Sequence, residues 1–143
     1  MSATTLDVII DRVRSICVEL PFEYVETLRF DSFELLPAGA IDGAFRVEGA
    51  SQQVHGYFNY MEERTDLLTV TVARPINADF DSVRRELTRA AQSLTSAITR
   101  DGVETTGLFT VADRGRAAKV IADPTNTFVE MRLTLPVNYE AQI

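Results

Sequence analysis

The sequence has one cysteine, one histidine and no tryptophan among its 143 residues. An intramolecular disulfide is therefore impossible, and Cys17 with His55 cannot supply the three or four ligands of a zinc site. A chain of this length buries roughly 70% of its unfolded surface, so folding does not require a disulfide or a metal. The sequence predicts a single domain spanning 1–143, with no metal site and no cofactor.

Basic residues are fewer than acidic residues. The chain has 14 of them against 21 acidic residues, and its net charge is −7. Tight binding to duplex DNA needs a concentrated basic face, which this composition argues against. No apolar run approaches the roughly 18 residues of a membrane span, and the start lacks the basic and apolar regions of a signal peptide. We expect a protein that is made inside the cell and does not enter a membrane.

Motifs of catalytic sites are also missing. The chain has no Gly-x-Ser-x-Gly, no helix-borne His pair and no glycine loop with the Lys-Ser or Lys-Thr ending of a phosphate-binding loop. Glu62 and Glu63 are adjacent in a predicted turn, where solvated carboxylates are the ordinary finding. His55 lies beside aromatic residues, where a packed or interface histidine is more common than a catalytic base. The sequence therefore predicts no catalytic residues and no enzyme.

Two segments have the spacing of amphipathic helices. Apolar residues recur at steps of three and four over 6–20, up to Pro21, and Cys17 lies on that stripe as a small buried hydrophobe. A longer helix is predicted over 79–100, with Gly102 as the residue that ends it. Its N-cap candidates are Asp79 and Asp81, and its apolar stripe consists of Val83, Leu87, Ala90, Ala91, Leu94, Ala97 and Ile98.

Alternating residues between these helices predict a three-stranded meander. The expected strands are 45–48, 54–61 and 67–73, separated by a turn at 49–53 and a polar turn at 62–66. The strand 54–61 has bulky residues on both faces, although a sheet with one covered face needs only one apolar side. The strand is therefore either covered on both faces within the fold or presents one face to another subunit, and we predict a contact with a subunit or partner. The candidate interface residues are His55, Tyr57, Tyr60 and Met61.

The last third of the chain predicts further strands. Strands are expected at 108–111 and 129–135, while 117–122 fits a strand or a short helical turn equally well. Pro136 cannot donate to a ladder, so the last strand either ends there or continues at a sheet edge. The fold class is α+β, with the N-terminal helix and the long amphipathic helix packed on an antiparallel or mixed sheet.

One local cluster of basic residues occurs in a predicted loop and the segment that follows it. Arg114, Arg116 and Lys119 stand close together in the sequence. A protein partner explains such a cluster as well as nucleic acid does, and plain solubilisation is the ordinary alternative.

The order of elements resembles the tail terminator proteins of long-tailed bacteriophages. The resembling segments are the helix 6–20, the strands 54–61 and 67–73, the helix from Phe80 and the closing segment 128–140. The resemblance implies a ring, usually a hexamer, at the head-proximal end of the tail tube. That ring ends tube growth and joins the tail to the head connector or stopper protein.

The resemblance also implies where the protein acts. It would reside in the virion neck, and in the host cytoplasm during assembly, and DNA would pass through the ring without specific binding. An acidic lumen suits that passage because like charge repels phosphate. The family has no catalytic residues to transfer.

Two other classes of protein fit less well. Small acidic chaperones of bacterial secretion systems also combine helices with a meander, and they bind an extended partner segment. They typically finish in a helix, whereas 128–135 alternates as a strand, so this hypothesis ranks second. A small-ligand-binding α+β domain ranks third, because a curved sheet under a helix can form a pocket.

Overall fold

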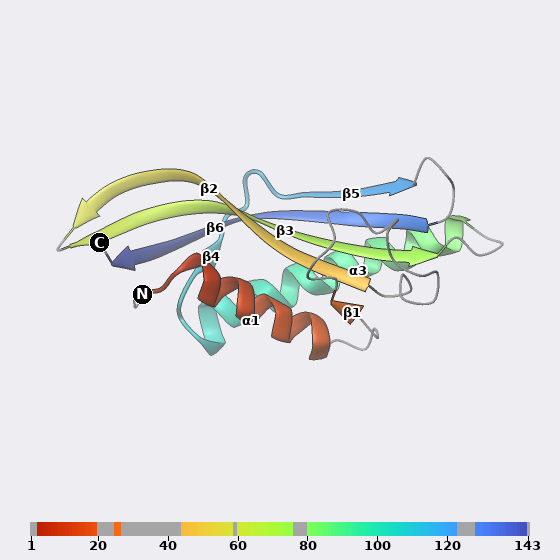
Figure 1. Cartoon of the computed structure of the whole chain (residues 1–143), viewed down its shortest axis with the longest axis horizontal. Coiled ribbons are helices and arrows are strands. Elements are labelled where there is room, and N and C mark those ends of the chain that lie inside the picture. Colours follow the sequence, from red (N-terminus) through yellow and green to blue (C-terminus); the bar gives the residue numbers. More distant parts are fainter. Residues whose placement is uncertain are drawn as a thin grey trace.

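The computed structural model describes residues 3–19, 25–26, 44–58, 60–75, 80–122 and 128–142, with backbone only at 25–26, 51–52 and 57–58. Within these ranges the elements follow an order close to the predicted one (Figure 1). They are α1 (Leu6–Glu19), β1 (Val25–Glu26), β2 (Ala44–Phe58), β3 (Met61–Pro75), α3 (Phe80–Arg100), a π-helical turn (Asp101–Thr105), β4 (Thr110–Val111), β5 (Ala117–Ala122) and β6 (Phe128–Gln142).

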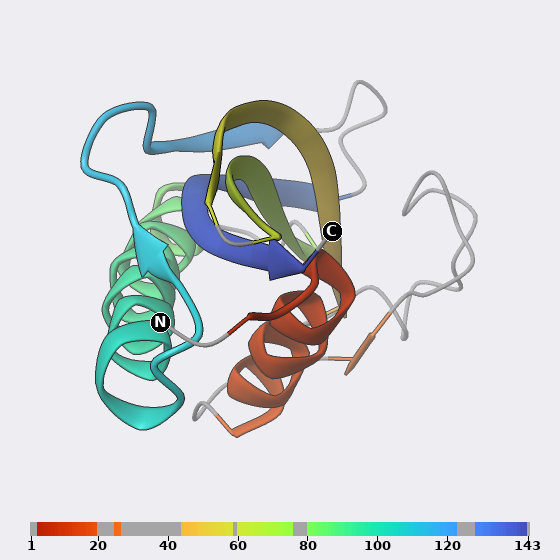
Figure 2. The ribbon, with the colours of Figure 1, turned by 90° about the vertical axis from the view of Figure 1, so that its left-hand side faces the viewer.

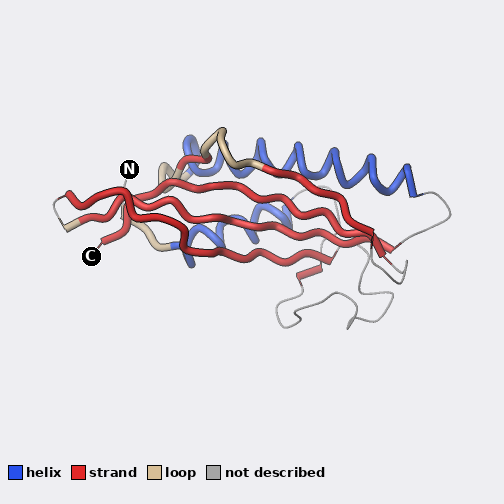
Figure 3. The backbone as a smooth tube through the Cα atoms, turned by 90° about the horizontal axis from the view of Figure 1, so that it is seen from above, coloured by secondary structure: helices blue, strands red, loops and turns tan. Residues whose placement is uncertain are grey.

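The strands form one mixed sheet, which confirms the predicted α+β class. Its order is β1-β2-β3-β6, and β4 and β5 both pair with the far side of β6. Every pair is antiparallel except β1 with β2. Figure 3 shows the long strands β2, β3 and β6 lying side by side along the molecule. Each is 15 residues long, so the sheet is far longer than the short strands that the sequence predicts.

Helices α1 and α3 lie on the same face of the sheet (Figures 1 and 2), which we call the inner face. The predicted helix stripes point into the core: Leu87 and Leu94 are 1% and 0% exposed, and Cys17 is fully buried. The strands contribute alternate residues to the same core. These include Val47, Leu68, Val70, Val72, Met131, Leu133, Leu135 and Val137.

The predicted meander is wrong in detail, because one long hairpin replaces it. β2 continues through the predicted turn at 49–53, and β3 includes the predicted polar turn at 62–66. The hairpin closes instead where Phe58 pairs with Met61. This end of the sheet extends beyond α1 (Figure 1), so its strands have little core to face. The two predicted turns, 49–53 and 62–66, accordingly carry no apolar alternation.

Gly102 does not end α3 as predicted. It is buried within the π-helical turn, and a Cβ at this position would lie only 2.5 Å from Cε2 of Phe109. The glycine is therefore needed for the close approach of Phe109. The left-handed backbone that commonly follows the end of a helix occurs instead at Gly107, whose φ is 65°. The candidate N-cap Asp79 lies outside the described residues.

β6 continues through Pro136 inside the sheet, whereas the sequence predicts an end or a sheet edge there. The carbonyl of Pro136 accepts a hydrogen bond from the Ala112 amide at 2.9 Å. In an antiparallel ladder the nitrogen and the carbonyl of one residue point to the same side. The nitrogen of Pro136, which has no hydrogen to donate, thus points to the gap between β4 and β5, where a ladder hydrogen bond is not required. The ambiguous segment, Ala117–Ala122, is strand β5.

Candidate functional site

Tyr60 occupies the turn at the end of the β2–β3 hairpin. It is 84% exposed and has φ of 66°, a left-handed backbone that turns usually assign to glycine or asparagine. Such a conformation costs about 1–2 kcal/mol for a residue with a side chain. The sequence places Tyr60 within a strand, so the turn is a correction. A large exposed aromatic ring on a strained turn is the kind of feature that binding sites retain.

The other predicted interface residues lie along the same hairpin. Met61 follows Tyr60 and is half-buried, whereas His55 is exposed on β2. The backbone of Tyr57 pairs with Glu62, and its side chain lies outside the described residues. The structure therefore brings these residues to the projecting end of one hairpin, which we call the hairpin tip (53–58 and 60–65).

A polar chain crosses three strands at the base of the hairpin tip. Nε2 of His55 lies 2.5 Å from Oγ1 of Thr65, and that hydroxyl donates to Oδ1 of Asn138 at 2.5 Å. Because the hydroxyl proton goes to Asn138, Nε2 of His55 must donate to Thr65. The imidazole thus links β2 to β3, and the Thr65 hydroxyl links β3 to β6.

A pocket of about 280 Å³ opens beside this chain. Its lining side chains are polar or charged, and they carry charges of both signs. The lining residues are His55, Glu63, Arg64, Asn138, Tyr139 and Glu140.

The three predicted basic residues lie in different settings. Arg116 turns to its own loop, where it donates to the Ala112 carbonyl at 2.8 Å and pairs with Asp113 at 3.2 Å. Arg114 is exposed in that loop, and Lys119 lies on β5.

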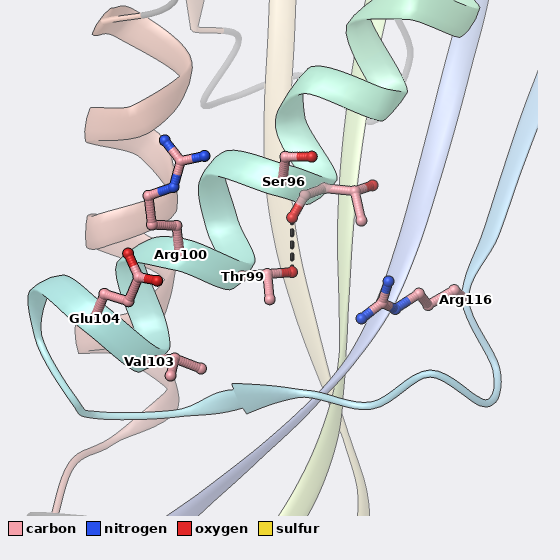
Figure 4. A pocket seen from close by; sticks show the side chains of 7 residues that line it. Ser96, Thr99, Arg100, Val103, Glu104 and Arg116 are labelled. Carbon is pink, nitrogen blue, oxygen red and sulfur yellow. Dashed lines mark hydrogen bonds between the residues drawn. The ribbon is translucent and has the colours of Figure 1, made fainter.

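Arg116 also lines a second pocket, of about 400 Å³, beside the end of α3. In Figure 4 its side chain extends from the loop toward Thr99 of α3. The Thr99 hydroxyl donates to the Thr95 carbonyl at 2.7 Å. The full lining is Thr95, Ser96, Thr99, Arg100, Val103, Glu104 and Arg116.

Two polar contacts, one buried and one part-buried, are absent from the sequence predictions. The Tyr139 hydroxyl donates to Oδ2 of Asp66, and the two residues are 2% and 0% exposed. Burial, and then the bond to Asp66, raise the pKa of Tyr139 above its ordinary value.

The second contact joins α1 to the end of α3. Nη2 of Arg12 lies 2.5 Å from Oδ1 of the nearly buried Asp101, and Nε lies 3.3 Å from Oδ2. The hydrogen bond to Asp101 raises the pKa of Arg12. This two-pronged contact fixes α1 against the π-helical turn.

No group of three His, Cys, Asp or Glu side chains that could hold a metal ion occurs among the described residues. A metal ion bound to the native state would raise the midpoint of thermal unfolding, and its removal would lower that midpoint. We expect chelation with EDTA to leave the midpoint unchanged within about 1 °C. Circular dichroism melts of treated and untreated protein provide the test. A fall of several degrees that added metal reverses would contradict the prediction.

Within the described ranges, neither helix combines the length and apolar character needed to cross a membrane. In the comparisons with known proteins, no family model matches the chain and no curated protein matches its sequence.

Proposed function

We propose that this protein is a ring-forming structural protein of a phage tail neck, a tail terminator that ends tube growth and joins the tail to the head connector. The observation that carries the proposal is Tyr60, an exposed aromatic residue on a strained turn at the end of a projecting hairpin. A tyrosine supplies large, rigid contact area with a polar end, which suits a protein interface.

The arrangement of the fold supports this role. Helices cover the inner face of the sheet, and the hairpin tip extends past α1 (Figure 1), where it can reach a neighbouring protein. In the proposed ring the net charge of −7 would keep the duplex from adhering to the lumen. The resulting partners are further copies of the chain, the tail tube protein and the connector or stopper protein.

Replacing Tyr60 with glutamate is expected to weaken assembly about tenfold while the folded monomer persists. The side chain contacts solvent, so the substitution removes little from the monomer but adds a charge to a contact surface. Sedimentation velocity across a concentration series measures assembly, and circular dichroism measures folding. Val18→Glu is the matched control, because Val18 is 64% exposed on α1, away from the hairpin tip.

The outcomes separate the hypotheses. A wild type that stays monomeric with and without assembled phage tail tubes would overturn the proposal. A stable dimer that captures an extended peptide would favour the secretion-chaperone alternative instead.

A further inference from the structure

The sheet has two open edges within the part of the chain that is described. On β2, strand β1 pairs only with Ala44 and Phe45, and no described strand flanks Val47–Ala50. On the opposite edge, no described strand lies beyond β5. An edge strand presents unpaired backbone N–H and C=O groups that can pair with another chain. Three consecutive residues of β2, Glu48, Gly49 and Ala50, are exposed, and so are Ala117–Lys119 of β5.

Strand directions make the two edges compatible with each other. β2, β3, β6 and β5 alternate in direction, so β5 runs opposite to β2. Copies related by rotation about an axis along the strands keep the same strand direction. The β5 edge of one copy would therefore meet the β2 edge of the next in the antiparallel pattern. An odd number of strands between the edges would have made the junction parallel.

Charge selects one register for that junction. Lys119 lies directly opposite Arg132 on the outer face, and like charges in that position are unfavourable. Arg132 pairs with Glu130 at 2.5 Å, whereas no described acidic residue forms an ion pair with Lys119. A lone edge lysine discourages indiscriminate strand pairing. An acidic residue opposite Lys119 on the incoming strand would offset the repulsion from Arg132, and it would turn the edge lysine from an obstacle to pairing into an ion-pair partner.

The β2 edge carries such an acid on the matching face. Glu48 lies on the outer face, and its side chain is 57% exposed while it pairs with Arg46 at 2.9 Å. Placing Lys119 opposite Glu48 also sets Val120 against Val47, both on the inner face. The remaining pairs, Ala118 with Gly49 and Ala117 with Ala50, have small side chains that let the backbones approach.

We propose that β5 of one copy pairs antiparallel with Val47–Ala50 of the next copy, with Lys119 opposite Glu48. The contact joins two different patches, so it is the heterologous kind that builds rings or open filaments. Its closure into a ring rests on the proposed function, whereas the strand pairing itself rests on the two edges and their charges.

Charge reversal tests the pairing on the full chain. Lys119→Glu and Glu48→Lys should each raise the concentration needed for assembly by about tenfold, and the double variant should return to within about threefold of wild type. Native mass spectrometry and sedimentation velocity measure the assemblies. Arg114→Glu is the matched control, because it makes the same charge change in the loop outside the strand edge.

Cysteine cross-linking provides a second measurement. A Glu48→Cys variant mixed with a Lys119→Cys variant should form a disulfide-linked dimer, because opposed residues of a ladder lie within disulfide reach. The native Cys17 is fully buried and should not take part in the cross-link.

Three outcomes decide between the claims. Wild-type rings that neither respond to the charge changes nor cross-link would overturn the strand pairing and leave the proposed function standing. Open filaments with charge rescue would support the pairing and overturn the ring. A wild type that stays monomeric, with no cross-link, would overturn both.

Discussion

Replacing Leu94 with alanine is expected to lower the free energy of unfolding by about 2–5 kcal/mol. Leu94 is 0% exposed in the middle of α3, where it belongs to the core that joins α1, α3 and the inner face of the sheet. The substitution removes the transfer free energy of three carbon atoms and leaves a cavity that the packed sheet cannot fully close.

Urea denaturation of wild type and variant measures this loss, with Leu87→Ala as an independent repeat on the same face. Ser93→Ala is the matched control, since Ser93 is exposed on the same helix and the change should stay within about 0.5 kcal/mol. Losses below about 1 kcal/mol at both leucines would contradict the packing of α3 on the sheet.

The helices could be predicted because their apolar spacing is dictated by the core they face. The stripe containing Leu87 and Leu94 repeats over more than four turns, and the predicted helix boundaries come within a residue of those of α3. The first half of β6 is predicted for the same reason, since its inner residues alternate from Val129 through Leu135. Local sequence is sufficient where one face of an element is continuously buried.

The hairpin could not be predicted from that signal. Beyond the helices the strand residues 62–66 are held by backbone pairing and by charges, with Arg64 lying 3.8 Å from Glu62 and 3.9 Å from Asp66. Such a segment has the composition of a turn. Tyr60, which sits in the real turn, has a residue type that turns disfavour.

For a related reason, the sequence indicates only some of the residues that lie together at the hairpin tip. Bulky apolar or aromatic residues on both faces of the predicted strand indicate Tyr60 and Met61, whatever the position of the turn. The contacts of Thr65 with Asn138 and of Asp66 with Tyr139 each join residues 73 positions apart. Only the register of β3 on β6 brings these pairs together, and no local pattern encodes that register.

Replacing Tyr139 with phenylalanine is expected to cost about 3 kcal/mol of folding stability at neutral pH. The ring still fills its place in the core, but the fully buried Asp66 loses the hydroxyl that donates to it. Removing one partner of a buried hydrogen bond costs the desolvation of the group left behind, and more where that group can carry a charge.

This cost should depend on pH in one direction. In the folded protein, burial and the bond to Asp66 hold the pKa of Tyr139 above its usual value of 10.0. Below pH 10 the phenol is protonated in both states and adds no pH dependence. Above pH 10 the unfolded chain loses this proton first, so wild type loses about 1.4 kcal/mol of stability per pH unit through this group.

Phenylalanine has no proton to lose, so the gap in unfolding free energy between wild type and Tyr139→Phe should narrow by about 1 kcal/mol between pH 10 and pH 11, since half of the unfolded phenol is already deprotonated at pH 10. Urea denaturation of both proteins at pH 7, 10 and 11 measures the gap, and the shared titration of other groups cancels in the difference. Tyr60→Phe serves as control, because an exposed hydroxyl should change stability by less than about 0.5 kcal/mol at neutral pH. A gap that stays constant up to pH 11 would mean that Tyr139 ionises equally in both states, and its bond to Asp66 would then not protect the phenol.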